Sequence, residues 1–220
     1  TDYTFGFDTA ATIATDAAER LRDTGRSHKR IMVLEVMGRH AGWVALFTGI
    51  AAGADYVCLP ERPVDVKDMA AKLKAAHARK GVALVVASEA IDLGDKKEEK
   101  LDEFGHMILK ERGVAERLTE VIQKETGLET RSAVIGHIQR GGPPTLFDRI
   151  LGTRVGVKAA QLAAEGRFGN MVALRGDQVV PVPLADAVGE LKVVPKAWLE
   201  LLDTLTAATQ GRRTETAGTR

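Results

Sequence analysis

Three short stretches of the chain place residues that could bind a ligand directly after an apolar run. Residues 37–39 read Met-Gly-Arg, residues 88–89 read Ser-Glu, and residues 137–142 read His-Ile-Gln-Arg-Gly-Gly. Arginine binds phosphate oxygens in pairs, glycine lets a ligand approach the backbone, and a carboxylate accepts hydrogen bonds from sugar hydroxyls. These residue types therefore suit a ligand that carries phosphate and hydroxyl groups.

Each stretch also has an ordinary structural interpretation, which the residues alone leave open. His137 and Arg140 are three residues apart in a glycine-rich turn and could hold one phosphate, but Arg140 could instead pair with a local carboxylate such as Asp148. Arg39 could bind an anion beside the N-terminus of the following helix, or lie in an ordinary loop. Glu89 could bind sugar hydroxyls, cap the next segment or pair with an arginine.

The elements that must position these residues alternate along the chain. Apolar β-type runs predict strands at residues 30–36, 55–59, 82–87 and 132–135, and a β-rich stretch at 171–182. Helices are expected at residues 8–23, 40–52, 65–79, 113–126, 147–164 and 196–207. The first helix should be capped by Asp8 or Thr9 and end before Gly25. This alternation predicts an α/β fold with a largely parallel sheet, in which ligands bind at the carboxyl ends of strands.

Two further arginines lie at the starts of apolar runs rather than at their ends. Arg30 begins the first expected strand, and Arg131 precedes the one at 132–135. In a parallel sheet, strand starts lie at the edge opposite to strand ends, so within one subunit both side chains should point away from the candidate site. They would be surface charges unless a second subunit brings them to its own site.

The overall charge gives no reason to expect a nucleic acid or an anionic membrane as partner. Lys plus Arg total 31 and Asp plus Glu total 30, so any anion site must be local. No apolar run approaches the roughly 18 residues of a membrane-spanning helix. The one cysteine excludes an intrachain disulfide, and the histidines outside the candidate site lack metal-ligand spacing: His28, His40, His77 and His106. A cytoplasmic protein, with no metal site in this sequence, is therefore expected.

Five runs, in order along the chain, resemble the 6-phosphofructokinase family. They are residues 1–10 (TDYTFGFDTA), 30–42 (RIMVLEVMGRHAG), 87–89 (ASE), 130–142 (TRSAVIGHIQRGG) and 148–151 (DRIL). An insertion at 92–113 is similar to the group of that family that contains both ATP-dependent and pyrophosphate-dependent members. The charged run 95–100 within it, and the polar tail from Thr209, should be solvated segments.

The resemblance implies a fold and a division of the chain. The fold would be a three-layer α/β/α arrangement of Rossmann-like topology. Residues 1–138 would form a sugar-phosphate-binding lobe, residues 139–192 would return to pack with a second, donor-binding lobe, and residues 193–220 would form a last helix and a mobile tail. The donor-binding lobe, with the catalytic base and the donor loop, would lie before Thr1, so the chain alone should be inactive.

The resemblance also implies roles for the residues at the first two strand ends. Met37, Gly38 and Arg39 would contact the sugar phosphate, and Arg39 would stabilise the phosphoryl group during its transfer. Glu89 would bind the sugar hydroxyls. Arg39 is the residue in this chain to which the resemblance assigns a catalytic role.

The sugar phosphate would be bound from two subunits. His137 and Arg140 would bind its 6-phosphate from the same chain, while Arg30 and Arg131 would reach in from a neighbouring subunit. This implies a homo-oligomer, either a dimer or a tetramer.

The implied reaction is transfer of a phosphoryl group from ATP, with Mg²⁺, to the 1-hydroxyl of fructose 6-phosphate in glycolysis. Two alternatives share the same sugar site. The donor could be pyrophosphate, which would make the reaction reversible. The protein could also be a non-catalytic subunit that binds the sugar phosphate and regulates a partner.

Overall fold

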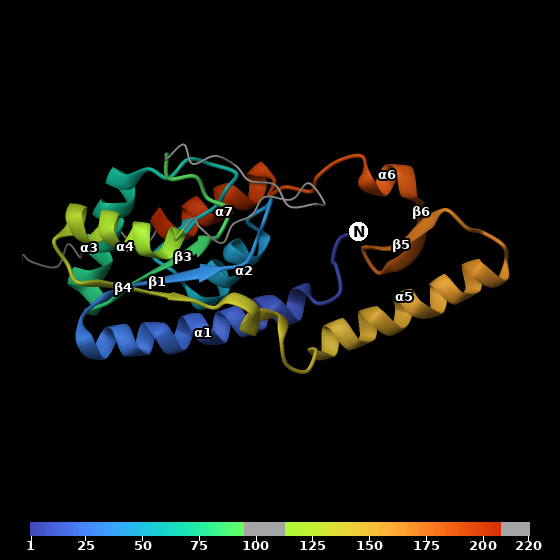
Figure 1. Ribbon diagram of the computed structural model, residues 1–220, viewed down its shortest axis with the longest axis horizontal. Helices are drawn as coiled ribbons and strands as arrows, with labels where there is room; N and C mark the ends of the chain where they lie inside the picture. Colours follow the sequence, from blue (N-terminus) through green and yellow to red (C-terminus); the bar gives the residue numbers. More distant parts are fainter. Residues whose placement is uncertain (95–112, 208–220) are drawn as a thin grey trace, which may run out of the picture. The chain divides into compact units, whose positions relative to one another are not determined.

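The computed structural model describes residues 1–94 and 113–207, which form two compact units (Figure 1). The larger unit combines Ala14–Gly136 with the segment that begins at Val193, and the smaller unit combines Thr1–Ile13 with His137–Lys192. The charged run 95–100, His106 and the tail from Thr209 lie outside the described residues. The division of function into lobes at 138 and 192 stays a prediction.

The larger unit is built on a four-stranded parallel sheet in the order β2-β3-β1-β4. Its strands are β1 (Ile31–Val36), β2 (Tyr56–Cys58), β3 (Ala83–Ser88) and β4 (Thr130–Val134). Its helices are most of α1 (Phe7–His28), then α2 (Trp43–Ala52), α3 (Val66–Lys80), α4 (Val114–Thr126) and α7 (Lys196–Ala207). The predicted α/β alternation and parallel sheet are confirmed.

The sheet separates two layers of helices (Figure 1). Ile31 and Val33 of β1 belong to a buried apolar cluster that includes residues of α3 and α4. Side chains alternate along a strand, so Met32 points to the other face, where it packs against α1. The side chain of Val57 lies against Gly49 of α2 on this second face. The expected three-layer α/β/α arrangement is therefore confirmed.

The prediction that the first helix ends before Gly25 is wrong. α1 continues through Gly25 to His28, and Gly25 is buried inside it. A Cβ at Gly25 would meet the side chain of Met32 and would lie 2.9 Å from Cγ2 of Val82. This glycine therefore permits close packing of the helix on the sheet and does not terminate the helix.

The smaller unit contains a helix and an antiparallel hairpin. Its elements are the 3₁₀ turn η1 (Gly136–Arg140), α5 (Leu146–Ala164), β5 (Asn170–Arg175), β6 (Gln178–Pro183) and α6 (Leu184–Val188). The division between the units falls within η1, because Gly136 belongs to the larger unit and the residues from His137 belong to the smaller one. The start of the chain lies beside the hairpin, because the Asp2 backbone N–H donates to the Leu174 carbonyl at 2.8 Å. The β-rich stretch at 171–182 is thus a hairpin separate from the parallel sheet.

The cap of α1 differs from the one expected. The helix starts at Phe7, so Asp8 and Thr9 lie in its first turn, and the capping carboxylate comes from Asp148 of α5. Asp148 is buried and accepts hydrogen bonds from the Gly6 and Thr9 backbone N–H groups, both at 2.8 Å, and from the Thr9 hydroxyl at 2.5 Å. Among the described ion pairs, none joins Asp148 to Arg140, so the pairing considered for these two residues is wrong.

We predict that Asp148→Asn lowers the free energy of unfolding by about 1–3 kcal/mol at pH 7, because an amide cannot accept all three hydrogen bonds. Burial opposes ionisation of Asp148, but the hydrogen bonds from Thr9 and Gly6 outweigh it and hold the carboxyl pKa below its ordinary value. This stabilisation is present above the pKa of the unfolded chain and is lost as the pH falls through the folded pKa. Urea unfolding should therefore show a smaller difference between variant and wild type at acidic pH. Asp186→Asn, at an exposed position of α6, serves as the control, and an equal loss at both pH values would contradict the assignment.

Candidate functional site

The carboxyl ends of β1 and β3 bring two of the predicted stretches together. These strands are adjacent and parallel, with Val36 of β1 beside Ser88 of β3. Residues 37–39 leave the end of β1, and Glu89 follows β3 directly. The predicted location of these residues, at one edge of a parallel sheet, is therefore confirmed.

Hydrogen bonds from the end of β3 fix the loop that follows β1. The Gly38 backbone N–H donates to Oε1 of Glu89 at 3.0 Å, and the Ser88 hydroxyl donates to the Gly38 carbonyl at 3.0 Å. A Cβ at Gly38 would lie 2.9 Å from the Ala41 carbonyl oxygen and 3.1 Å from the Ser88 hydroxyl oxygen. Only glycine fits here without displacement of the loop, which explains why this residue type precedes Arg39.

Arg39 and Glu89 both offer polar atoms at this edge. Arg39 is exposed and forms no hydrogen bond or ion pair with the described residues. Glu89 uses Oε1 for the loop and forms no ion pair with an arginine of the described residues. An arginine and a carboxylate oxygen can therefore meet a ligand beside the same short loop.

His137 and Arg140 lie on η1, in the smaller unit. Both side chains are exposed, and residues i and i+3 of a 3₁₀ turn project from the same side. Gly136 and Gly142, on either side of the pair, have φ of +55° and +81°. Glycine adopts such positive φ angles without strain, which agrees with the expected use of glycine in this turn. The turn can therefore present an imidazole and a guanidinium to one anion.

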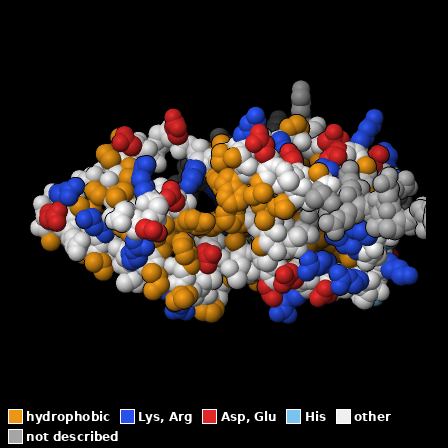
Figure 2. Space-filling model, turned by 180° about the vertical axis from the view of Figure 1, so that it is seen from behind, with side chains coloured by type: hydrophobic (Ala, Val, Ile, Leu, Met, Phe, Trp, Pro, Cys, Tyr) orange, Lys and Arg blue, Asp and Glu red, His pale blue; other side chains and the backbone are white. Residues whose placement is uncertain are grey.

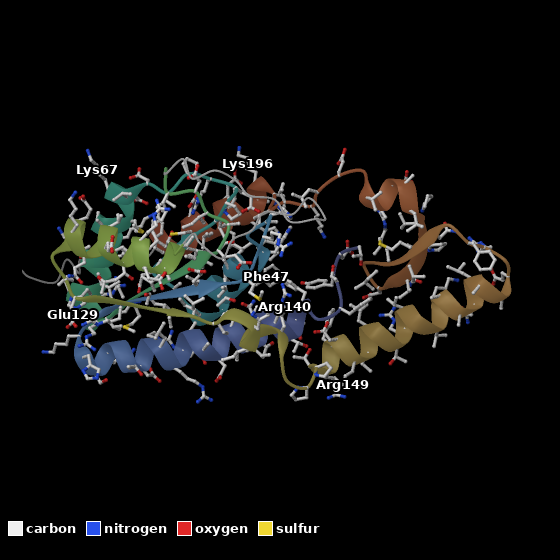
Figure 3. The ribbon with its side chains drawn as sticks, in the orientation of Figure 1. Phe47, Lys67, Glu129, Arg140, Arg149 and Lys196 are labelled. Atoms are coloured by element: carbon white, nitrogen blue, oxygen red, sulfur yellow. The ribbon has the colours of Figure 1, made fainter. Side chains whose placement is uncertain are left out.

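Arg30 and Arg131 lie at the opposite edge of the sheet, as predicted. Each donates to Oε1 of Glu129, at 2.9 Å and 2.8 Å respectively. Figure 3 labels Glu129. The hydrogen bond from Arg30 holds the pKa of the Glu129 carboxyl below its ordinary value. Nε of Arg30 is buried and has no hydrogen-bond partner among the described residues. One carboxylate thus binds both guanidinium groups at the amino-terminal ends of β1 and β4.

Two acidic residues that the sequence did not single out also lie near the site. Glu35 of β1 accepts a hydrogen bond from the Ala115 backbone N–H at 2.7 Å and so caps α4. Burial raises the pKa of Glu35, the Ala115 hydrogen bond opposes this, and the charges of Glu116 and Glu89 add to the rise. Glu61, three residues after Cys58 at the end of β2, accepts the Gly42 backbone N–H at 2.9 Å. The position of Glu61 after a strand was the one signal in the sequence that could have marked it as a site residue. The neighbouring residues do not indicate that its partner is Gly42.

Comparison with known proteins identifies the family. The family model described as "Phosphofructokinase" matches residues 1–163. The chain belongs to the phosphofructokinase family. Among solved structures, phosphofructokinase from Pichia pastoris in the T-state has a TM-score of 0.69 at 29% identity, over 95% of this chain and 22% of that one.

Relatives within the phosphofructokinase family carry two kinds of name. The pyrophosphate–fructose 6-phosphate 1-phosphotransferase of Streptomyces coelicolor is 47% identical, over 91% of this chain and 59% of that protein. The ATP-dependent 6-phosphofructokinase 2 of the same organism is 48% identical, over 89% of this chain and 58% of that protein. The chain therefore spans less than two thirds of the length of these relatives.

No group of three or more His, Cys, Asp or Glu side chains in residues 1–94 and 113–207 could hold a metal ion.

Burial raises the pKa of Cys58 to about 12, so this thiol stays protonated at neutral pH. None of the described helices is long and apolar enough to cross a membrane.

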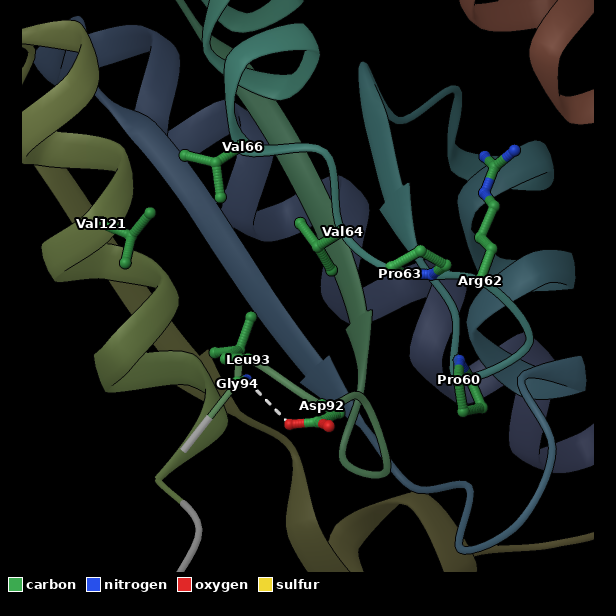
Figure 4. Close-up of a pocket in the computed structure, with 9 residues that line it drawn as sticks. All are labelled: Pro60, Arg62, Pro63, Val64, Val66, Asp92, Leu93, Gly94 and Val121. Atoms are coloured by element: carbon green, nitrogen blue, oxygen red, sulfur yellow. Dashed lines mark hydrogen bonds between the residues drawn. The ribbon is translucent and has the colours of Figure 1, made fainter. Parts of the chain in front are cut away.

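A pocket of about 520 Å³ lies beside the candidate site in the larger unit (Figure 4). Its lining is mostly apolar and comes from the segments after β2 and β3, from the start of α3 and from α4. Arg62 and Asp92 contribute the charged groups, and Asp92 accepts the Gly94 backbone N–H at 2.8 Å. The pocket includes none of the predicted site residues.

We predict that Gly38→Ala lowers the free energy of unfolding by about 1–3 kcal/mol, because the added methyl group is too close to the Ala41 carbonyl and to Ser88. The double variant Gly38→Ala with Ser88→Ala removes one of these two close atoms. The effects of the two substitutions, measured by urea unfolding, should therefore be less than additive. A fully additive double variant, or a Gly38→Ala variant as stable as wild type, would contradict this packing.

Proposed function

We propose that the protein that contains this chain transfers a phosphoryl group to the 1-hydroxyl of fructose 6-phosphate. The observation that carries the proposal is the loop after β1, which Glu89 and Ser88 hold through Gly38 while Arg39 stays unpaired among the described residues. The names of the relatives support the substrate, since both kinds include fructose 6-phosphate or phosphofructokinase.

Each residue of the site then has a role that suits its chemistry. Met37 and Gly38 contact the sugar phosphate, and the Glu89 carboxylate accepts hydrogen bonds from sugar hydroxyls. Arg39 places a fixed positive charge beside the phosphoryl group in transfer, where negative charge is spread over the oxygens. His137 and Arg140 hold the 6-phosphate, a dianion that a guanidinium can bind through two N–H groups.

The reaction also needs a base and a loop that binds the donor. The oxygen of the 1-hydroxyl attacks the terminal phosphorus of the donor, and the hydroxyl proton passes to a base. The remainder of the donor leaves with the electrons of the broken P–O bond. We assign the base and the donor loop to the remaining two fifths of a full-length relative. The chain by itself is then expected to bind the sugar phosphate without turning it over.

ATP with Mg²⁺ is the proposed donor, and pyrophosphate is the second candidate. Mg²⁺ would neutralise the charge that develops on the donor oxygens. The two kinds of relative are almost equally similar to this chain, at 48% and 47% identity, so identity does not choose between the donors. A glycolytic role with either donor fits a cytoplasmic location.

A homo-oligomer accounts for Arg30 and Arg131. β1 has six residues, so its two ends are about 20 Å apart, and an arginine at its start cannot reach a ligand at its end. A neighbouring subunit can use these two arginines for its own sugar phosphate. In the proposed assembly, they bind the 6-phosphate together with His137 and Arg140.

The smaller unit is proposed to pack against the donor-binding lobe. Leu146, Phe147 and Ile150 at the start of α5 are exposed, and so is Val157 further along the helix. Figure 2 shows exposed hydrophobic side chains on one face of the molecule. Exposed apolar clusters commonly mark interfaces, which supports a further lobe as their cover.

We predict that Arg140→Ala weakens fructose 6-phosphate binding by about 1.5–3 kcal/mol, the usual loss for a charged hydrogen-bond partner. The measurement is a calorimetric titration of the chain and its variants. Arg167→Ala, at an exposed arginine of the same unit that pairs with Glu165, is the control and should bind as wild type does. Unchanged affinity of Arg140→Ala would remove this residue from the site.

The donor is tested on the full-length protein with fructose 6-phosphate and Mg²⁺. ATP and pyrophosphate are compared in an assay for fructose 1,6-bisphosphate. We expect turnover with ATP, and turnover with pyrophosphate instead would establish the second candidate. Binding of fructose 6-phosphate with no turnover from either donor would contradict the proposed activity.

A further inference from the structure

Glu61 binds two backbone segments that are far apart in the sequence. Its Oε1 accepts the Gly42 N–H at 2.9 Å and the Val194 N–H at 3.1 Å. Its Oε2 is buried and has no hydrogen-bond partner among the described residues. A carboxylate oxygen shared by two N–H donors is held in one place, so Glu61 can act as a fixed point for both segments.

The first segment is the start of α2. Gly42 is the N-cap residue of this helix and provides no side-chain cap, and the first turn of α2 has no acidic residue. A negative charge near a helix N-terminus is stabilising, and Glu61 supplies it from the segment after β2. A Cβ at Gly42 would lie 2.8 Å from Oε2 of Glu61 and 2.7 Å from Cδ2 of Leu59. Glycine at this position therefore allows the carboxylate to reach the backbone.

The loop of residues 38–42 is consequently held at both ends by carboxylates. Glu89, from the end of β3, binds the Gly38 N–H, and Glu61, from the end of the adjacent β2, binds the Gly42 N–H. Arg39 lies between these two anchored positions. Because both anchors contact backbone atoms, they set the path of the loop and hence the direction in which Arg39 leaves it.

The second segment leads into α7, which keeps Glu61 in position. Val194 is buried, and α7 begins two residues later. Arg62, the neighbour of Glu61, pairs with Asp203 of α7 at 2.7 Å. Contacts with α7 and the segment before it thus hold the residues after β2 in place. Glu61 lies among these residues and binds the Gly42 backbone, so the loop is held as well.

We propose that Glu61 is a positioning residue for the loop that carries Arg39, and this proposal rests on the proposed function in naming that loop the sugar-phosphate site. Glu61 does not contact the substrate. It acts through the Gly42 backbone, so that the loop is preorganised before fructose 6-phosphate arrives. Preorganisation raises affinity because less freedom is lost on binding.

Two measurements on the full chain test this role. Hydrogen exchange reports whether the backbone of residues 37–46 is held, and calorimetric titration with fructose 6-phosphate reports affinity. Glu61→Ala should raise exchange in 37–46 and weaken binding about tenfold. Glu61→Gln retains an oxygen that can accept both N–H groups, so it should restore most of the protection and most of the affinity.

Asp65→Ala is the matched control. The Asp65 carboxylate also caps a helix of the larger unit, since it accepts the Lys67 and Asp68 backbone N–H groups at 3.0 Å each. Its loss should reduce stability without a change in exchange at 37–46 or in affinity. A general loss of stability would affect both variants alike, whereas a positioning role affects Glu61→Ala alone.

The outcomes separate the two proposals. Unchanged exchange at 37–46 in Glu61→Ala and in Glu61→Gln would overturn the role of Glu61, and so would increased exchange with unchanged affinity. A wild-type chain that does not bind fructose 6-phosphate would overturn the proposed function instead. In that case the exchange measurement still decides whether Glu61 holds the loop.

Discussion

The hydrogen bond from the Gly38 backbone N–H to Glu89 is the interaction on which the candidate site depends. It joins the loop after β1 to the end of β3, and it requires both the parallel pairing of these strands and the absence of a side chain at Gly38. The Ser88 hydroxyl on the Gly38 carbonyl completes this attachment. The Gly38 backbone is thus fixed within the chain, while the Arg39 side chain is exposed.

The same sheet places Arg39 at one end of its strands and two further arginines at the other end. Arg39 follows the end of β1, while Arg30 and Arg131 lie at the starts of β1 and β4, where Glu129 holds both. A single carboxylate between the two guanidinium groups keeps them close together. This arrangement suits the proposed sharing of a phosphate between subunits of an assembly.

Local patterns predicted most of the fold and the first members of the site, but contacts between distant segments could not be predicted. Apolar runs and helical spacing give each strand of the parallel sheet, and a parallel sheet places residues 37–39 beside Glu89. Gly25 was misinterpreted because a glycine that ends a helix and one that packs against Met32 look alike in sequence. The cap from Asp148 and the role of Glu61 were missed because their partners are more than a hundred residues away or across the sheet edge.

The most direct test of the sugar-phosphate site is a calorimetric comparison of three ligands on the wild-type chain. Fructose 6-phosphate, fructose and inorganic phosphate are titrated under the same conditions. If Glu89 binds the hydroxyls while arginines bind the phosphate, fructose 6-phosphate should bind at least roughly tenfold more tightly than either of its parts. Equal affinity for inorganic phosphate and fructose 6-phosphate would contradict a site that recognises the sugar.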